Sequence, residues 1–442
     1  MSLIASVSLS RVQAQDNSPY SRYGIGTLTP STNVVNRAMG GISAAYNDLL
    51  SVNFTNPASY STFKLYQEAR SKNTISGRVI LDAGIDFSNR TLREGTQPDK
   101  FTSGDGYFSY VQVGIPLKKN WGLSFGIRPV SRIYYKINQQ EVLTDPNSHL
   151  PIDSALTQFT GDGGAFLPTI GTGFAIKNLS LGVNMGYLFG RKDFSSKRGL
   201  FNDSTNYKEG NYETKTSFGS IFFSAGLQYK INLNKTTTLT LGAYGNMEQK
   251  LNASQDIIRE TFVRNSSGAD VTLDSVYSQK DIKGKIVYPA HYGVGITFER
   301  RQEDNLGGWL FGVDLVQNKW SNYRFYNTID SVRDNWELHI GGQLMPAPKK
   351  NYFSNVAYRA GLVFGPDYIH VGSNISQFGV SFGVGLPVTN YNRQAPGQFT
   401  MLNLAFEYLK RGNNNNLLKE NLFRFSVGLN LSDLWFGKRK YD

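Results

Sequence analysis

The sequence predicts an all-β fold, namely a transmembrane antiparallel β-barrel of about fourteen strands with an N-terminal plug segment inside its lumen. Three observations lead to this prediction. Apolar and polar residues alternate along most of the chain, the connections alternate between short and long, and the five Trp residues fall at the ends of expected strands. The residues before this pattern begins form a separate N-terminal segment.

Composition narrows the possible classes of protein. The 442 residues include 46 Lys and Arg against 34 Asp and Glu, which gives a net charge of +12. The mean hydropathy of −0.35 argues against a helical membrane protein but not against a barrel, whose alternating strands average to neutral hydropathy. The absence of Cys excludes disulfides, zinc–thiolate sites and thiol catalysis. Because the basic residues are scattered singly, we expect no nucleic-acid binding.

The two ends of the chain differ from the middle. The first residues are small and apolar and end in Val12-Gln13-Ala14, as at a signal-peptide cleavage site. The last residues are basic. We therefore expect a signal-peptide remnant at 1–14, a plug at 15–70, the barrel at 71–434 and a basic periplasmic tail at 435–442.

The strands are predicted from alternation with a period of two. Residues 179–190 show it most clearly, with apolar side chains at the odd positions and small or polar ones at most even positions. Strands are expected to begin near residues 74, 106, 121, 165, 179, 216, 236, 286, 308, 334, 354, 375, 398 and 422. Tight turns are expected at 118–120, 177–178 and 232–235, and long polar loops at 90–106, 137–164, 195–215 and 254–282. Outer-membrane barrels have this alternation of short turns and long loops.

The positions of the Trp residues separate a barrel from a soluble sandwich, whose buried face would also alternate. Trp121, Trp309 and Trp435 lie at the turn-side ends of expected strands, and Trp320 and Trp336 at the loop-side ends. Amphipathic rings favour the headgroup level of a bilayer, so we expect two aromatic girdles. The face opposite the apolar one carries charges of both signs, which predicts a lumen of paired charges. Its members include Arg78, Asp82, Arg128, Asp314, Glu337, Arg359, Glu407 and Arg424.

Residues 15–70 do not alternate and are rich in Gly, Ser and Asn. Such a length is too long for an ordinary connection. A disordered tail would lack aromatic residues, but this segment carries Tyr20, Tyr23, Tyr46 and Phe54. We therefore expect it to fold inside the barrel.

A run in this segment has a family resemblance. Gly40-Gly41, with Asp48 further on and then Asn56-Pro57-Ala58, resembles the hatch signature of the FadL/TodX family of outer-membrane hydrophobic-compound transporters. The resemblance implies a small N-terminal hatch that plugs a fourteen-stranded barrel. It covers the architecture, but only the hatch matches in detail, and no ligand-contacting residue can be carried over. The basic ending after Trp435 departs from the usual terminal aromatic and indicates a divergent branch. Such branches include barrel subunits of larger machines.

Asp48 is the expected charged anchor of the hatch, paired with a lumen arginine such as Arg78, Arg128, Arg359 or Arg424. The alternative is that Asp48 caps a local turn through its own backbone. Pro129, in the third expected strand, is the candidate for a break in the wall, because proline cannot donate to a sheet ladder. The alternative is that Pro129 lies where the strand has already left the membrane.

Two functions follow as expectations. The first is passive transport of hydrophobic small molecules across the bacterial outer membrane, through the hatch and a lateral opening. The second is a non-transporting barrel subunit or scaffold of a secretion or barrel-assembly machinery. A transporter needs a continuous apolar pocket, and the expected lumen is polar. The expected partners are outer-membrane lipid, a hydrophobic small molecule, and other outer-membrane proteins or lipoproteins.

Enzymatic chemistry is not expected. Ser124 and Ser381 each lie in a Gly-x-Ser-x-Gly pattern, but both fall in mid-strand without the following helix that a nucleophile elbow requires. The four His residues are dispersed, without metal-ligand spacing. We expect no metal site and no cofactor.

Overall fold

The fold is described from a computed structural model of the 442-residue chain. The described residues are 18–67, 74–94, 100–144, 147, 151–201, 207–303, 306–349, 351–388, 398–413, 416 and 418–435. The expected signal-peptide remnant and all of the expected basic tail after Trp435 lie outside them. Trp435 itself is the last residue of the final strand rather than the first of a tail.

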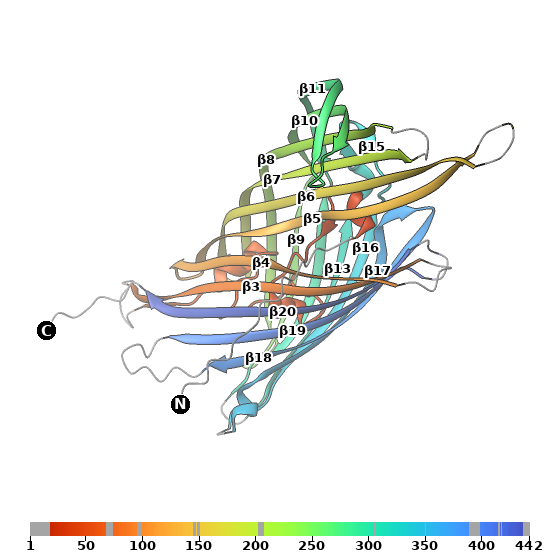
Figure 1. Ribbon diagram of the computed structural model, residues 1–442. Coiled ribbons are helices and arrows are strands. Elements are labelled where there is room, and N and C mark those ends of the chain that lie inside the picture. The colour runs from red at the N-terminus through yellow and green to blue at the C-terminus, as the bar shows by residue number, and fades with distance from the viewer. Residues whose placement is uncertain are drawn as a thin grey trace, which may run out of the picture.

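The barrel is a closed antiparallel ring of fourteen strands within the described residues, which confirms the predicted all-β antiparallel barrel (Figure 1). Its strands are β3 (Thr74–Glu94), β4 (Lys100–Lys118), β5 (Trp121–Thr144), β6 (Pro151–Ile176), β7 (Leu179–Phe201), β8 (Glu209–Asn232), β9 (Thr237–Asn246), β12 (His291–Arg300), β13 (Gly308–Asn318), β16 (Asn335–Met345), β17 (Ala357–Val371), β18 (Ser373–Val388), β19 (Phe399–Arg411) and β20 (Leu418–Trp435). The ring closes where β20 pairs with β3, from Trp435 opposite Gly77 to Leu418 opposite Glu94.

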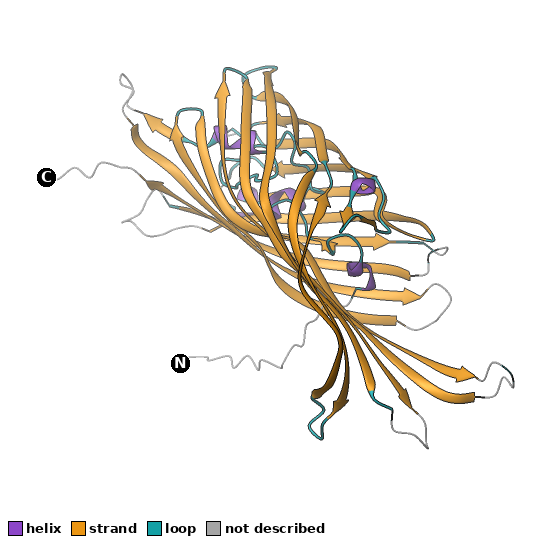
Figure 2. Ribbon diagram, turned by 90° about the horizontal axis from the view of Figure 1, so that it is seen from above, coloured by secondary structure: helices purple, strands orange, loops and turns teal. Residues whose placement is uncertain are grey.

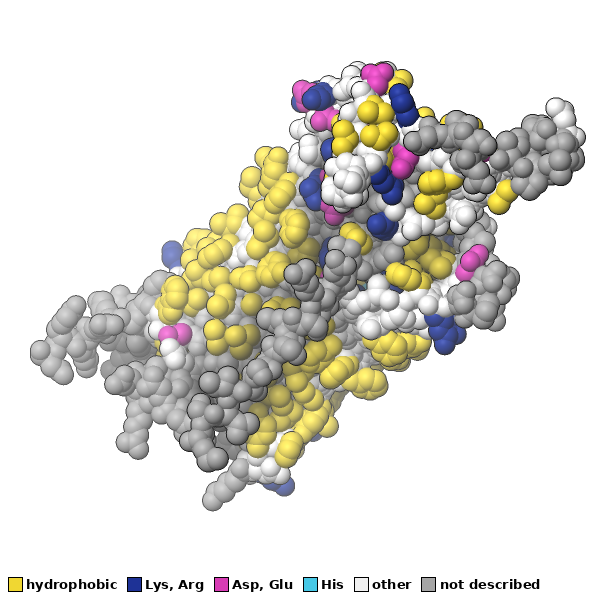
Figure 3. Space-filling view, viewed as in Figure 1, with side chains coloured by type: hydrophobic (Ala, Val, Ile, Leu, Met, Phe, Trp, Pro, Cys, Tyr) yellow, Lys and Arg dark blue, Asp and Glu magenta, His cyan; other side chains and the backbone are white. Residues whose placement is uncertain are grey.

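Apolar side chains cover the outside of the barrel. On β7, the alternate residues from Leu179 to Phe189 are exposed, while their neighbours point inward. Figure 3 shows hydrophobic side chains in a band across the wall, with charged side chains gathered at the end that carries β10 and β11. None of the helices in the described residues has the length and apolarity needed to cross a membrane.

The aromatic girdles form in part. Trp121, Trp336 and Trp435 are exposed at strand ends, as expected. Trp320 is not a girdle residue, because it is only 3% exposed and packs against Tyr368 with ring centroids 4.7 Å apart. It lies in a short 3-10 helix, η3 (Trp320–Asn322), where loop packing buries it.

Several strands continue far beyond the apolar band, so the predicted long loops are largely wrong. β6 has 26 residues, whereas a membrane crossing needs about nine to eleven. The region expected as the loop 254–282 is mostly a hairpin of β10 (Gln249–Arg264) and β11 (Asp270–Tyr288), and β10 also pairs with β8. Outside the band both faces of a strand are wet, so the apolar alternation disappears while backbone pairing continues.

The wall is interrupted between β4 and β5. Their pairing runs from Lys118 opposite Trp121 to Val111 opposite Ile127 and goes no further. Pro129 lies two residues beyond Ile127, and the pairing of β5 with β6 shifts register between Pro129 and Ser131. Beyond this point, β5 pairs on its open side with β1 (Thr27–Leu28), a short strand of the N-terminal segment.

The N-terminal segment, residues 18–63, is largely buried among the strands. It contains the 3-10 helix η1 (Pro19–Arg22), the helix α1 (Val34–Arg37) and the 3-10 helix η2 (Pro57–Thr62), followed by β2 (Leu65–Gln67), which pairs with β3. The helices in Figure 2 lie among the strands of the ring. α1 contacts β18, β19 and β20, and η2 contacts the wall from β4 to β8.

Candidate functional site

The glycine pair of the N-terminal segment ends helix α1 against the wall. Asn33 caps the start of this helix, because its side-chain oxygen accepts from the Asn36 N–H. Gly40 and Gly41 then take φ values of +68° and +91°, which a residue with a side chain rarely adopts. A Cβ at Gly40 would lie 2.7 Å from the Leu362 carbonyl oxygen on β17. Glycine at these positions therefore allows both the turn after α1 and the close contact between the segment and β17.

The Asn56-Pro57-Ala58 turn starts helix η2 at the opposite wall. The side-chain oxygen of Asn56 accepts from the Ala58 N–H at 3.1 Å, and Pro57 takes the first helical position. The Asn56 amide donates to the Ala44 carbonyl at 2.6 Å, which joins the two turns of the segment. A Cβ at Gly182 on β7 would overlap Pro57. Small residues on the inner wall thus allow this contact.

A buried ion pair joins the segment to the wall. Arg37, at the end of α1, contacts Asp86 on β3 at 2.5 Å, and both side chains are almost fully buried. The other guanidinium nitrogen of Arg37 donates to the Thr32 carbonyl at 2.9 Å and to the Ser109 hydroxyl at 2.8 Å. A paired and hydrogen-bonded charge of this kind is costly to break.

Two further carboxylates of the wall bind backbone amides of the segment. Asp314 on β13 accepts from the N–H groups of Ser43 at 2.6 Å and Ala44 at 2.7 Å. Asp82 on β3 accepts from the Val52 N–H at 2.9 Å. These bonds satisfy backbone donors that would otherwise be buried without partners.

A histidine on the wall binds a carbonyl of the segment. His339 on β16 donates from Nδ1 to the Gly40 carbonyl at 2.6 Å, and its Nε2 lies 3.3 Å from Glu337. His339, Asp314 and Asp82 each bind the backbone of the segment, and Asp82, Asp314 and Glu337 belong to the charges predicted for the lumen. Among the described residues, no group of three or more His, Cys, Asp or Glu is placed to hold a metal ion.

Asp48 does not reach a lumen arginine. Its carboxylate accepts from the Leu50 N–H at 3.1 Å and from the Ser51 hydroxyl at 2.8 Å, both within its own turn. The expected anchor is therefore wrong in residue and in sign, because the segment supplies the cation, Arg37, and the wall the carboxylate, Asp86. A turn of the segment can satisfy an aspartate locally.

The remaining predicted lumen residues have mixed partners. Arg424 pairs with Glu407 at 3.1 Å. Arg359 instead donates to the neutral Gln343 and Asn403 side chains, and Arg78 to Ser432. Arg128 contacts no carboxylate among the described residues and lines a cavity.

A cluster from three distant segments holds Gly24 at the loop-side end of the lumen. The Gly24 carbonyl accepts from Lys192 Nζ at 2.7 Å and from the Tyr323 hydroxyl at 2.9 Å, and its N–H donates to Asp330 at 2.8 Å. Burial lowers the pKa of Lys192 to about 8, and the Asp330 carboxylate offsets part of this shift. Nothing in the sequence signals this cluster, because Lys192 lies within β7, while Tyr323 and Asp330 lie far along the chain between β13 and β16.

A second cluster missed by sequence reasoning surrounds Arg411, the last residue of β19. Its guanidinium contacts Asp367, with one nitrogen–oxygen distance of 2.9 Å, and lies 3.7 Å from Glu420. Glu420 also pairs with Arg90 at 2.9 Å. The ring of Tyr20 lies 4.7 Å from the Arg411 guanidinium, so this cluster too touches the N-terminal segment.

The segment also closes the open edge of β5. Beside the two pairs of β1, the Thr29 N–H donates to the Val130 carbonyl at 3.1 Å and the Thr29 hydroxyl to the Pro129 carbonyl at 2.8 Å. The Ser131 hydroxyl donates to the Ile25 carbonyl at 2.7 Å. Pro129 therefore lies at a real interruption of the wall, which residues of the segment fill.

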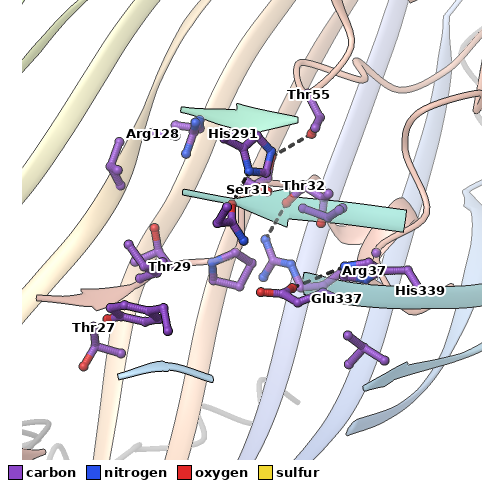
Figure 4. A pocket seen from close by; sticks show the side chains of 18 of the residues that line it. Thr27, Thr29, Ser31, Thr32, Arg37, Thr55, Arg128, His291, Glu337 and His339 are labelled. Carbon is purple, nitrogen blue, oxygen red and sulfur yellow. Dashed lines mark hydrogen bonds and ion pairs between the residues drawn. The ribbon is translucent and has the colours of Figure 1, made fainter. Parts of the chain in front are cut away.

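A cavity of about 320 Å³ remains between the segment and the wall. Arg128 and His291 lie at one end of it, and Arg37, Glu337 and His339 lie at the other (Figure 4). Its charged lining residues are Arg37, Arg90, Arg128, Arg411, Arg424, Glu337, Glu407 and Glu420.

Several solved structures are similar in fold to this chain. A Pseudomonas aeruginosa FadL homologue aligns with a TM-score of 0.53 and 11% identity, covering 92% of this chain and 99% of that one. The CymD monoaromatic hydrocarbon channel aligns with a TM-score of 0.51 and 13% identity, covering 93% and 98%. The Pseudomonas putida toluene transporter TodX aligns with a TM-score of 0.50 and 13% identity, covering 93% and 99%. At such identities, the likeness shows a shared fold.

Sequence comparison gives one family. No curated protein sequence matches this chain. The family model described as BamG matches residues 1–442.

Proposed function

The chain belongs to the BamG family, and from this premise we propose that it is a barrel subunit of a multi-protein assembly in the bacterial outer membrane. The observation that carries the proposal is that the N-terminal segment occupies the two routes a transporter would use. It is bonded to the wall inside the lumen, and it fills the interruption beside Pro129. The family match is compatible with this role.

The segment acts in this proposal as a permanent plug. Its polar contacts reach strands on several sides of the ring, including Asp86 on β3, Asp314 on β13 and His339 on β16. Gln228 on β8 adds a fourth side, since its amide donates to the Ala44 carbonyl at 3.0 Å. Moving the plug would break the buried Arg37–Asp86 pair and would also leave buried backbone N–H groups without acceptors, which is costly.

The remaining cavity supports the same conclusion. Transport of hydrophobic molecules requires a mostly apolar path with few polar groups. The cavity is lined by five arginines and three glutamates, as well as by apolar side chains. An apolar molecule crossing it would have to displace water from these charges without replacing their hydrogen bonds.

The part of the barrel beyond the apolar band offers a surface for partners. β11 is exposed over most of its length, and within the described part of the chain it pairs on the side away from β10 with Arg324 and Phe325 alone, at its end. Val271, Leu273, Val276 and Tyr277 are exposed on it. Apolar side chains on an open strand edge are typical of protein–protein contacts. Other outer-membrane proteins or lipoproteins are the partners we propose.

The second candidate function is transport of hydrophobic molecules through a lateral opening, and one specific observation favours it. The β4–β5 pairing stops at Ile127, which is where a lateral exit for hydrophobic molecules would need the wall to open. Transport through this opening would require the residues from Ile25 to Thr29 to leave the edge of β5. The solved structures with the same fold include a toluene transporter and a monoaromatic hydrocarbon channel.

The experiment is a comparison of tagged chains purified from their own membranes in a mild non-ionic detergent. Wild type should carry a partner in a fixed ratio. Val276→Asp combined with Tyr277→Asp should lose it, because charge replaces apolar contacts on β11. The matched control is Ile329→Asp, which changes an apolar residue that is 78% exposed and lies outside β11, and it should keep the partner. A wild-type chain that purifies alone and transports toluene into vesicles would overturn the proposal.

A further inference from the structure

Arg128 has an unusual position among the arginines of the lumen. It lies one residue beyond Ile127, where the β4–β5 pairing ends, and its side chain lines the cavity. Its guanidinium donates one long hydrogen bond to the Pro129 carbonyl, at 3.5 Å, and lies 5.9 Å from the centre of the Phe54 ring. Neither contact supplies a negative charge.

The other arginines that line this cavity all have carboxylate partners. Arg37 pairs with Asp86, Arg90 with Glu420, Arg411 with Asp367, and Arg424 with Glu407. Within the described part of the chain, Arg128 has no carboxylate within ion-pair distance. A guanidinium in a cavity walled by protein, without a counter-charge, is a costly arrangement unless an anion completes it.

Aromatic rings line the cavity beside this cation. Phe222 and Tyr288 meet edge to face, with centroids 5.7 Å apart, and Tyr288 in turn contacts Trp320 at 6.2 Å. Trp320 continues the row to Tyr368. All four line the cavity, so one of its walls is apolar and aromatic while Arg128 supplies a single fixed positive charge. Aromatic walls of this kind suit a flat apolar body.

We propose that this cavity binds a compact organic anion, with one carboxylate, sulfonate or phosphate group on a planar apolar body. The guanidinium of Arg128 binds the anionic group through two parallel hydrogen bonds, and the planar body packs against the aromatic row from Phe222 to Trp320. The volume of about 320 Å³ is at the lower end of the range for small-molecule sites. The ligand would lie between Arg128 on β5 and the aromatic row, whose members belong to β8, β11 and η3.

This inference is independent of the proposed function. A subunit that docks partners through β11 can hold a small anion in its lumen or lack one, and a test of either leaves the other standing. The residues that carry the inference, Arg128 and the aromatic row, take no part in the surface on β11.

The test uses refolded full-length protein in a non-ionic detergent and isothermal titration with benzoate, benzenesulfonate and phenyl phosphate. Benzyl alcohol is the neutral control for the body, and inorganic phosphate is the control for the anionic group. We expect saturable binding of at least one aromatic anion, with benzyl alcohol and inorganic phosphate at least about tenfold weaker.

Variants then locate the site. Arg128→Gln should weaken binding at least about tenfold. Arg128→Lys should weaken it less, because lysine keeps the positive charge but lacks the paired N–H groups of the guanidinium. Arg359→Gln is the matched control, since Arg359 is a lumen arginine outside the cavity lining. It should leave binding unchanged. If Arg128→Gln does not fold, judged by heat-modifiable migration, Arg128→Lys decides the matter. Absence of binding by all three anions, or equal binding by wild type and the folded Arg128 variant, would overturn the inference.

Discussion

The Nη1 atom of Arg37 donates to both carboxylate oxygens of Asp86, at 2.5 and 2.6 Å, and this pair joins the N-terminal segment to strand β3. The two residues are 49 positions apart in the chain, and neither side chain is more than 2% exposed. The same nitrogen also donates to the Ser426 hydroxyl at 3.1 Å, so the pair reaches β20 as well. The pair therefore ties the segment to the seam where the barrel closes.

Removing one partner of this pair should strongly destabilise the protein. Arg37→Gln or Asp86→Asn leaves the other charge buried alone, which typically costs about 3–5 kcal/mol. The free energy of unfolding in urea, measured on vesicle-reconstituted barrels, would give the loss. Arg198→Gln is the control, because its pair with Glu141 is exposed and should contribute less than about 1 kcal/mol. Equal losses in the buried and exposed variants would contradict the assigned role of Arg37.

A methyl group on the inner wall should displace the segment. Gly242 on β9 faces Ala44 so closely that a Cβ would overlap its carbonyl oxygen. Gly242→Ala should therefore loosen the segment and raise the single-channel conductance in planar bilayers. At Gly104 on β4, the nearest atom to a Cβ is 3.8 Å away, so Gly104→Ala should leave conductance unchanged. If both variants conduct like wild type, the segment does not limit ion flow.

Stability should rise with pH through the titration of Lys192, which lies beyond Phe189, where the continuous outward apolar run of its strand ends. Burial lowers the pKa of Lys192 from 10.5 to about 8 in the folded protein. Between these values the unfolded chain binds the proton and the folded one does not, so raising the pH favours the folded state. The temperature of conversion to the heat-modified form should rise with pH between about 8 and 9.5. Lys192→Met should remove this part of the slope, and identical slopes would contradict the assignment.

The pairing of β1 with the open edge of β5 can be locked by a single engineered disulfide. Leu28 lies opposite Ser131 in the register of β1 and β5, and the chain has no Cys of its own. Leu28→Cys with Ser131→Cys should therefore oxidise readily in the folded barrel. Leu28→Cys with Thr144→Cys, at the far end of β5, should not. Mass spectrometry of trypsin digests distinguishes the two. An absent cross-link in the first variant would mean that β1 does not occupy this edge.

Sequence reasoning succeeded where one physical rule dominates. Within the apolar band each strand has one lipid-facing and one inward face, so the alternation of residues 179–190 locates β7 and its neighbours. The rule fails beyond the band, because a strand with two wet faces, such as most of β11, has no apolar period. The long polar stretches were for that reason predicted as loops.

The site was predictable only in its local chemistry. The glycine pair that begins at Gly40 and the turn that begins at Asn56 can be predicted as tight turns from the sequence itself. Tertiary packing decides which charged residue of the segment forms an ion pair with the wall. Nothing near Arg37 in the sequence distinguishes it from a solvated arginine. The same holds for Lys192, whose partners Gly24 and Asp330 are far away in the chain.

The most direct test of the central claim is the mass of the native particle that contains this chain, extracted from its own membranes in mild detergent and measured by native mass spectrometry. The account predicts a particle heavier than the 49.3 kDa chain, with at least one other outer-membrane protein or lipoprotein in a fixed ratio. A particle with the mass of the single chain, together with saturable transport of a hydrophobic compound by that particle in vesicles, would contradict it.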